Sequence, residues 1–110
     1  LLTNTTGFWN VSKIVCDAAG NVYVGTNGNN QGLQRSTNGG TSWTNITPTN
    51  PGNSNSITDI KVSSTGRLHV TMSGTNGAGS YFTDNGATVT SASWTTPITP
   101  IPNLNANCEI

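Results

Sequence analysis

Charged residues, methionine and histidine are scarce in this chain, and no long hydrophobic run occurs. Only 7% of its 110 residues are Asp, Glu, Lys or Arg, and the formal net charge is zero. Nucleic acids and anionic membranes attract strongly basic surfaces, so neither is expected as a partner. No stretch approaches the roughly 18 apolar residues that a membrane-spanning helix needs, so membrane insertion is not expected either.

Cysteine is nearly absent, with Cys16 and Cys108 the two in the chain. The pair would form a disulfide in an oxidising compartment. The alternative is that Cys16, next to Val15, is a small buried thiol on a strand, while Cys108 lies near one end of the sequence. Strand pairing alone does not bring the two positions together, so the sequence leaves both interpretations open.

Glycine, asparagine, threonine and serine are abundant instead, and they separate short apolar runs. Thr, Val and Ile on strands, with Asn and 13 Gly at turns, indicate an all-β protein. Disordered chains combine low hydrophobicity with high net charge, so disorder is not expected. Uncharged surfaces rich in Asn and Thr are common on secreted and cell-surface proteins, and the composition favours one of those locations.

Two segments of the chain repeat each other. Residues 36–43 read Ser-Thr-Asn-Gly-Gly-Thr-Ser-Trp, and a weaker echo at 82–89 reads Phe-Thr-Asp-Asn-Gly-Ala-Thr-Val, 46 positions later. The stretches before them align at that offset without a gap, and the matched positions are apolar residues and turn glycines: Ile14 with Ile60, Gly20 with Gly66, Val24 with Val70, and Gly40 with Gly86. Repeats of about 40–50 residues built of strands are typical of propeller blades.

Each repeat predicts four short strands. We expect strands at 14–16, 22–26, 33–36 and 43–46 in the first repeat, and at 60–62, 67–72 and 80–82 in the second. The fourth strand of the second repeat is expected to begin at Trp94, after an insertion of five residues. Tight turns are expected at 17–21, 38–40, 63–66 and 84–86.

The repeats divide the chain into four parts. Residues 1–11 are a lead-in or belong to a preceding blade, 12–58 form the first repeat, 59–98 the second, and 99–110 a Pro-rich linker and the start of a third. Four-stranded blades close into rings of about four to eight, and repeat units bury their cores only against neighbours. We therefore predict an all-β chain of two four-stranded propeller blades, a fragment of a larger ring; a protomer that assembles with identical subunits is the alternative.

The repeated motif resembles the Asp-box, or BNR repeat. The pattern Ser-x-Asp/Asn-x-Gly-x-Thr/Ser-Trp is carried in the first repeat by Ser36, Asn38, Gly40, Ser42 and Trp43, and in the second by Asp84, Gly86 and Thr88. Phe82 and Val89 depart from the Ser and Trp positions. The resemblance implies the blades of a β-propeller, as found in sialidases, xyloglucan-active glycoside hydrolases, Vps10/sortilin-type receptors and secreted bacterial surface proteins.

The chemistry of the motif supports a role in folding. A short Asx side chain accepts hydrogen bonds from backbone N–H groups of its own turn. The Gly takes a positive φ, which a tight hairpin requires. The Trp is expected to cover the hairpin and pack into the blade core. A motif of this kind builds a fold and does not distinguish among the functions of the family.

No catalytic constellation is recognisable. A sialidase needs a cluster of arginines, whereas this chain has only Arg35 and Arg67. A glycosidase needs two carboxylates that face each other across the scissile bond. The four acidic residues are accounted for by a turn, the Asp-box and two equivalent positions in successive repeats: Asp17, Asp84, and Asp59 with Glu109. His69, aligned with Tyr23, has no Cys or His at metal-ligand spacing. We predict no catalytic residue, metal or cofactor in this chain.

Four aromatic residues are candidates for contact with a ligand or partner: Trp9, Tyr23, Tyr81 and Trp94. Flat aromatic rings stack on sugars and anchor interfaces. The sequence favours a non-catalytic structural, adhesive or protein-binding module of a secreted or cell-surface bacterial protein. Its partners would be other blades or identical subunits, and a protein or carbohydrate ligand.

Two alternatives remain for the function. In the first, the chain is part of an Asp-box glycoside hydrolase whose catalytic residues lie outside this segment. In the second, it is a self-assembling β-repeat filament subunit whose open strand edges pair end to end.

Overall fold

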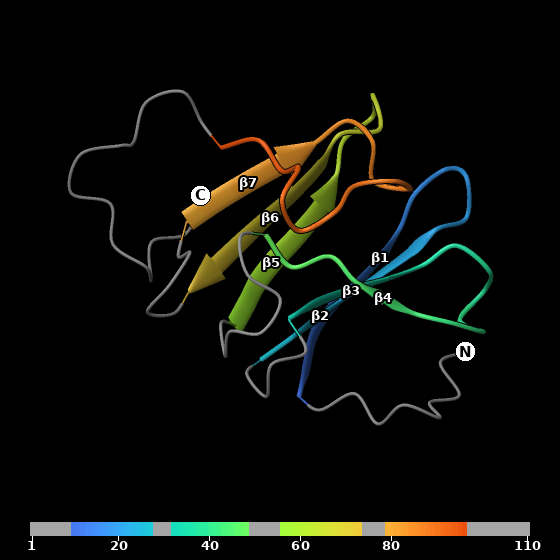
Figure 1. Cartoon of the computed structure of the whole chain (residues 1–110), viewed down its shortest axis with the longest axis horizontal. Coiled ribbons are helices and arrows are strands. Elements are labelled where there is room, and N and C mark those ends of the chain that lie inside the picture. Colours follow the sequence, from blue (N-terminus) through green and yellow to red (C-terminus); the bar gives the residue numbers. More distant parts are fainter. Residues whose placement is uncertain (1–9, 28–31, 49–55, 74–78, 97–110) are drawn as a thin grey trace.

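The structure, a computed structural model, describes residues 10–27, 32–48, 56–73 and 79–96. These residues form two antiparallel sheets and contain no helix (Figure 1). Sheet 1 consists of β1 (Val11–Cys16), β2 (Val22–Thr26), β3 (Leu33–Ser36) and β4 (Thr44–Asn45). Sheet 2 consists of β5 (Ser56–Val62), β6 (Leu68–Ser73) and β7 (Gly79–Thr83). The expected all-β class is confirmed.

Both sheets follow the order of the chain, so each strand pairs with the next one. The bounds of β2 and β3 are those expected, whereas β1 and β5 begin several residues earlier than expected. The turns between the first two strands of each sheet also match. Gly20 and Gly66 adopt φ angles of 90° and 87°, which favour glycine because it has no Cβ.

The expectation of a fourth strand in the second repeat is wrong. Thr95 makes a single bridge to Phe82, with reciprocal backbone hydrogen bonds of 2.9 Å, instead of a strand. The preceding residues are taken up by two successive turns, closed by bonds from Thr88 N to Asn85 O and from Ser93 N to Thr90 O, both 3.0 Å. These turns occupy residues 85–93, so the described chain meets β7 only at Thr95.

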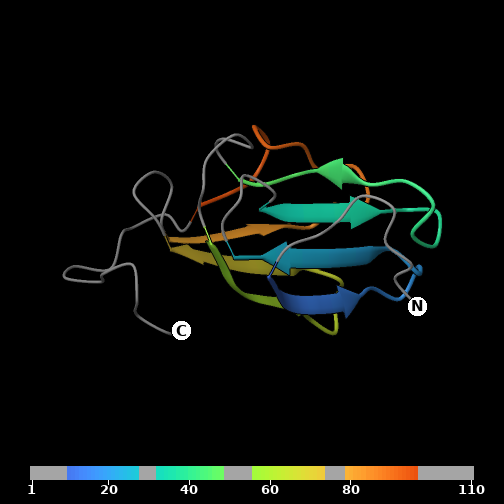
Figure 2. The same cartoon turned by 90° about the horizontal axis from the view of Figure 1, so that it is seen from below.

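The two sheets enclose one hydrophobic core between them. Figure 2 shows the strands of both sheets aligned along one common axis, with neighbouring strands pointing in opposite directions. The strands of sheet 2 alternate, with every second side chain directed at sheet 1. In β6 these are Leu68, Val70 and Met72, which are at most 2% exposed. Sheet 1 contributes Tyr23, Leu33 and Ile46, and sheet 2 adds Ile57, Ile60 and Tyr81.

The register of the sheets shifts the alignment of the two repeats by one residue in their third strands. In sheet 1 Tyr23 lies opposite Arg35, while in sheet 2 the equivalent His69 lies opposite Phe82. The counterpart of Arg35 is therefore Phe82, and not Tyr81 as the ungapped alignment implies. A shift of one residue moves a side chain to the other face of a sheet, and Tyr81 accordingly lies in the core, 6% exposed.

Candidate functional site

The contact of β5 with β1 and β2 is closely packed. A Cβ atom on Gly25 would stand 2.6 Å from Ile57 Cγ2 and 3.1 Å from Ile60 Cδ1, so only glycine fits at this position of β2. The Ser12 hydroxyl donates a hydrogen bond of 2.6 Å to the Ile57 carbonyl. Polar groups at the edge strands and apolar groups behind them thus join the two sheets.

Asp17 organises the first turn and connects it to the core. Its carboxylate accepts four hydrogen bonds, from the backbone of Ala19 and Asn21, the Asn21 amide and the Tyr23 hydroxyl, at 2.8–3.0 Å. Burial raises the pKa of Asp17, but these hydrogen bonds outweigh it and leave the pKa below its ordinary value. Burial, and then the bond to Asp17, raise the pKa of Tyr23, so the hydroxyl stays protonated.

Two long side chains cross from one sheet to the other. Arg35 of β3 donates from Nη1 to the carbonyls of Gly86 and Val89, at 3.0 and 2.7 Å. In the other direction, the Trp94 indole Nε1 donates to the Ile46 carbonyl at 2.7 Å. These contacts could not be predicted from the sequence because they join residues about fifty positions apart. Arg35 thus connects β3 to the turns that follow β7.

The turn at residues 36–42, the box turn, carries the motif that resembles the Asp-box and has the hydrogen bonds that its residues predict. Ser36 Oγ accepts from Gly40 N at 2.8 Å, and Asn38 Oδ1 accepts from Ser42 N at 2.9 Å. Asn38 Nδ2 also donates to Ser42 Oγ at 2.8 Å. Gly40 adopts a φ of 92°, which confirms its expected conformation. This turn is closed by neutral side chains alone.

Trp43 does not occupy the position expected of it. The residue is half-buried, lies outside the core cluster of the described residues, and has its ring 3.6 Å from where a Cβ on Gly40 would stand. It covers the hairpin, as expected, but the tryptophan that packs against the core is Trp94. The box turn places Trp43 at the end of the sheet, beyond the reach of the residues between the two sheets.

The second box turn differs from the one expected. Thr83 Oγ1 accepts from Asn85 N at 3.0 Å, so Thr83 and Asn85 take the places of Ser36 and Asn38, one residue later than the alignment implies. The Asp84 carboxylate is bound by Arg67 through two hydrogen bonds of 2.8 and 3.0 Å instead of closing its own turn. The Arg67 guanidinium holds the pKa of Asp84 below its usual range.

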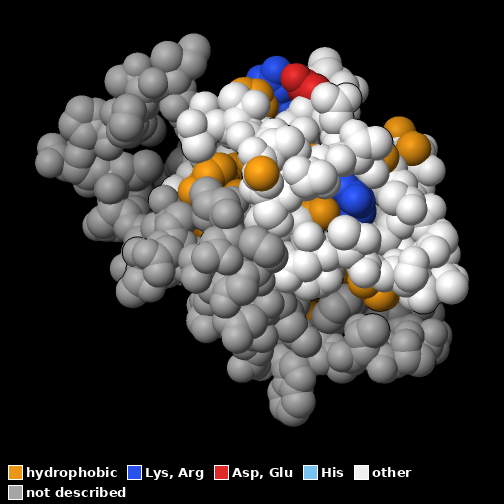
Figure 3. Space-filling model, in the orientation of Figure 1, with side chains coloured by type: hydrophobic (Ala, Val, Ile, Leu, Met, Phe, Trp, Pro, Cys, Tyr) orange, Lys and Arg blue, Asp and Glu red, His pale blue; other side chains and the backbone are white. Residues whose placement is uncertain are grey.

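The other two expected box residues of the second repeat also act differently. Gly86 is not among the glycines with positive φ. It is required because a Cβ would collide with the Tyr23 hydroxyl. Thr88 is exposed, and its backbone N–H closes the turn on Asn85 O. Figure 3 shows the acidic and basic side chains together at this end of the molecule.

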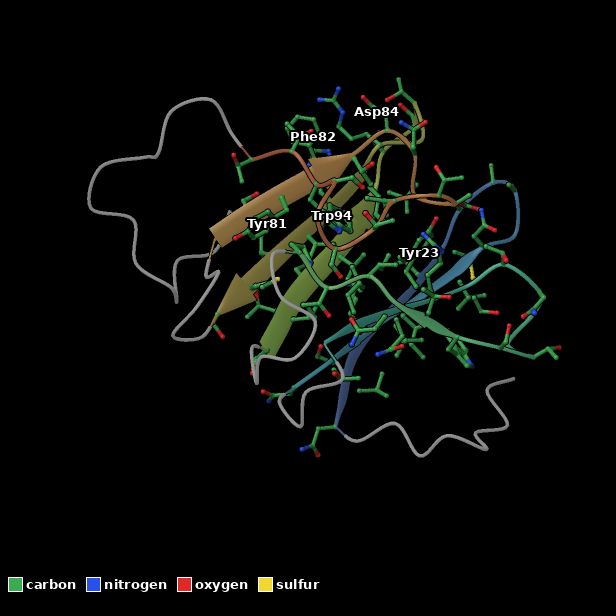
Figure 4. The ribbon with its side chains drawn as sticks, viewed as in Figure 1. Tyr23, Tyr81, Phe82, Asp84 and Trp94 are labelled. Atoms are coloured by element: carbon green, nitrogen blue, oxygen red, sulfur yellow. The ribbon has the colours of Figure 1, made fainter. Side chains whose placement is uncertain are left out.

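The candidate aromatic residues do not form an exposed surface. Tyr23 and Tyr81 are 1% and 6% exposed, and Trp94 is half-buried against the core. Figure 4 shows Tyr23 and Trp94 on the side where the two sheets meet. The core thus takes up the rings of Tyr23 and Tyr81 and leaves them little surface for a ligand. The role of Trp94 in binding a ligand stays a prediction. Trp9 lies outside the described residues.

The acidic residues that the structure describes are all engaged. Asp17 closes a turn, Asp84 pairs with Arg67, and Asp59 forms an ion pair with Lys13 at 3.4 Å. Among the described residues, no three His, Cys, Asp or Glu side chains gather as ligands for a metal ion. Glu109 falls in a part of the chain that the structure does not describe.

The position of Cys16 differs from the interpretation that it is a buried thiol. Cys16 is a free thiol and exposed on β1, not a buried one, because its side chain points away from the core that lies between the sheets. Cys108 lies outside the described residues, so the structure says nothing of its pairing.

The outer face of sheet 2 carries a shallow hollow that sequence inspection did not single out. Its volume is about 210 Å³, and its walls come from all three strands: Asp59 and Lys61 of β5, His69 and Thr71 of β6, and Ser80 of β7. The residues alternate along their strands with the core residues, so the hollow lies on the side opposite the core. A signal was present in the sequence, since these polar residues alternate with apolar ones.

Comparison with known proteins gives no relative. No model of a protein family, no curated protein and no solved structure matches this chain. Within the described ranges there is also no helix with the length and hydrophobicity to cross a lipid bilayer.

Proposed function

We propose that the chain is a pair of Asp-box blades from a larger β-propeller, and that it acts as a non-catalytic structural, adhesive or protein-binding module of a secreted or cell-surface bacterial protein. The observation that carries the proposal is the relation of the two sheets. Two successive repeats form sheets with the same strand order that face each other across a shared core.

The position of the first strands supports a radial arrangement. In a propeller, successive four-stranded sheets are set around a central axis. Here β1 and β5, the first strands of the two sheets, approach within 8 Å of each other, Cα to Cα. The hydrogen bond from the Ser12 hydroxyl to the Ile57 carbonyl and the Lys13–Asp59 ion pair join the two strands. This is the arrangement that neighbouring blades adopt next to the axis.

The turn of the first repeat supports the family. Its Ser36 and Asn38 side chains accept hydrogen bonds from backbone N–H groups of the same hairpin, which is the role expected of the Asp-box. The non-catalytic assignment rests on the carboxylates. Each described carboxylate is held by a turn or a basic side chain, whereas a glycosidase needs two carboxyl groups that act on the substrate.

The test is the size and shape of the native protein. We expect the intact denatured mass of the polypeptide from its natural source to exceed several-fold the 11.4 kDa of this sequence, and electron microscopy of the native protein to show a ring. A native species of 11.4 kDa that stays monomeric contradicts the propeller. Hydrolysis of xyloglucan or sialosides by the native protein contradicts the non-catalytic role and leaves the fold intact.

A further inference from the structure

The hollow lies on the face of sheet 2 that is equivalent to the face of sheet 1 against which sheet 2 packs. The residues of the two sheets can be matched through their cross-strand pairs. Lys13–Gly25 in sheet 1 corresponds to Asp59–Thr71 in sheet 2, and Val15–Tyr23 corresponds to Lys61–His69. In the same way, Gly25–Leu33 corresponds to Thr71–Ser80. The five residues that line the hollow are thus the repeat equivalents of five residues of sheet 1: Lys13, Val15, Tyr23, Gly25 and Leu33. The five residues of sheet 1 can therefore be compared directly with the five that line the hollow.

In sheet 1, the residues at these positions other than Lys13 form an apolar surface against which sheet 2 packs. Gly25 lies against Ile57 and Ile60, and the neighbouring Leu33 is fully buried. In sheet 2 the residue equivalent to Leu33 is Ser80, and that equivalent to Val15 is Lys61. A pair of isoleucines placed here would leave an ammonium group and a hydroxyl buried without partners, which costs several kcal/mol. The hollow is therefore suited to a polar group.

The charge of that group follows from the partners of the basic residues. The chain has four Lys and Arg residues. Lys13 pairs with Asp59, Arg67 pairs with Asp84, and Arg35 donates to backbone carbonyls. Lys61, by contrast, has no partner among the described residues, and it is exposed. Its ammonium group is the unbalanced charge of the hollow.

The other walls of the hollow are compatible with an anion. Asp59 is the one carboxylate there, and it is already bound by Lys13 at 3.4 Å and by the Ile60 N–H at 2.9 Å. Ser80 presents a hydroxyl group, which donates hydrogen bonds to oxygen acceptors. The Thr71 hydroxyl shares a hydrogen bond of 2.7 Å with the Thr58 hydroxyl, and it can donate to an anion when Thr58 is the donor of that bond. His69 presents an imidazole N–H beside Lys61, since the two residues lie opposite each other in the β5–β6 ladder.

We propose that this hollow binds a carboxylate group, with Lys61 Nζ as its ion-pair partner and with His69, Thr71 and Ser80 as hydrogen-bond donors. The carboxylate belongs to a free organic acid such as a uronic acid or to an acidic side chain of a neighbouring chain. The site goes beyond the proposed function. In a propeller the next blade covers this face and supplies the carboxylate as an acidic side chain, whereas on an open face a free acid binds there.

The experiment is an NMR titration of the ¹⁵N-labelled chain with D-glucuronate, with D-glucose as the uncharged control. We expect saturable shifts of the backbone amides at 59–61, 69–71 and 80 with glucuronate, and none with glucose. N-acetylglutamate amide serves as the second probe. Binding at least tenfold tighter than glucuronate identifies an acidic side chain as the source of the carboxylate. Absence of saturable shifts with both acids overturns the proposal.

Three exposed substitutions separate a specific site from general attraction of anions. Lys61→Gln should weaken binding about tenfold, since it removes the ion pair. Asp59→Asn should leave binding unchanged or strengthen it, because it removes the carboxylate from the hollow. Arg67→Gln is the control with the same loss of charge on the same sheet, and it should change binding less than twofold. Equal weakening by Lys61→Gln and Arg67→Gln overturns the site.

Discussion

Tyr23→Phe removes one hydroxyl group from the contact between the first turn and the core. The ring is 1% exposed, and its hydroxyl donates to Asp17 Oδ2 at 2.9 Å. A hydrogen bond to a charged group contributes about 1.5–3 kcal/mol to stability. Asp17 is only half-buried and keeps three other hydrogen bonds, so we expect a loss near the lower limit, about 1.5 kcal/mol. For a chain of this length that loss lowers Tm by about 5–10 °C.

The loss should depend on pH in two directions. Because the pKa of Asp17 is lowered in the folded state, its contribution is present above the unfolded pKa of about 3.9 and disappears as the pH falls through the folded value. Because the pKa of Tyr23 is raised, its contribution is present below about pH 10 and disappears above it. The Tyr23→Phe variant should therefore lose less stability than the wild type in acid and in alkali.

The measurement is urea unfolding at pH 7 and pH 3, repeated in an Asp17→Asn background. The coupling between the two substitutions at pH 7 should be about 1 kcal/mol. The reasoning fails if Tyr23→Phe costs less than about 0.5 kcal/mol at pH 7, or if it costs the same with and without the Asp17 carboxylate.

Three further predictions concern the contact between the sheets, and urea unfolding at pH 7 measures each of them. Gly25→Ala should destabilise by about 1–3 kcal/mol because the added methyl collides with Ile57, and Ile57→Ala in the same chain should relieve part of that cost. Arg35→Met should cost about 2–3 kcal/mol because two backbone carbonyls lose their donor, and an unchanged midpoint would contradict its role in connecting β3 to the turns that follow β7. Trp94→Ala should cost about 3–5 kcal/mol and Trp43→Ala less than half as much, since only Trp94 packs against the core; the reverse order would refute the core described above.

The strands and turns that depend on nearby residues were predictable from the sequence. The bounds of β2 and β3 follow from alternation between Gly and Asn punctuation. Gly20, Gly40 and Gly66 adopt positive φ because the turns that contain them are closed within four or five residues. In these cases the residues that determine the conformation lie inside the segment itself.

The register and the distant contacts were not predictable. An ungapped alignment of the repeats makes Tyr81 the equivalent of Arg35. In the strand registers of the two sheets, the residue equivalent to Arg35 is Phe82. A register shift of one residue between β6 and β7 determines which side of β7 faces the core, and the amino-acid composition does not reveal such a shift. The same shift moves the box of the second repeat from Asp84 to Asn85. Only the pairing of β6 with β7 determines both outcomes.

The candidate site was predictable in part. The hydrogen bonds of Ser36 and Asn38 follow from the motif alone. The burial of Tyr23 does not, because a tyrosine on an alternating strand is equally compatible with either face until the second sheet is placed. The hollow on sheet 2 also requires the structure, since its residues come from three strands and align with their counterparts in sheet 1 only through the registers.

The absence of a side chain at Gly25 has a consequence for the shape of anything built from these sheets. β5 approaches β1 and β2 within 8 Å, Cα to Cα, at the edge where Gly25 lies. Beyond β2 the sheets are joined through the long side chains of Arg35 and Trp94. The layers are thus thin at one margin and thick at the other. The missing methyl group at residue 25 thus sets how closely sheet 2 approaches sheet 1 at this margin, and Thr71, at the equivalent position of sheet 2, would hold a further layer farther away.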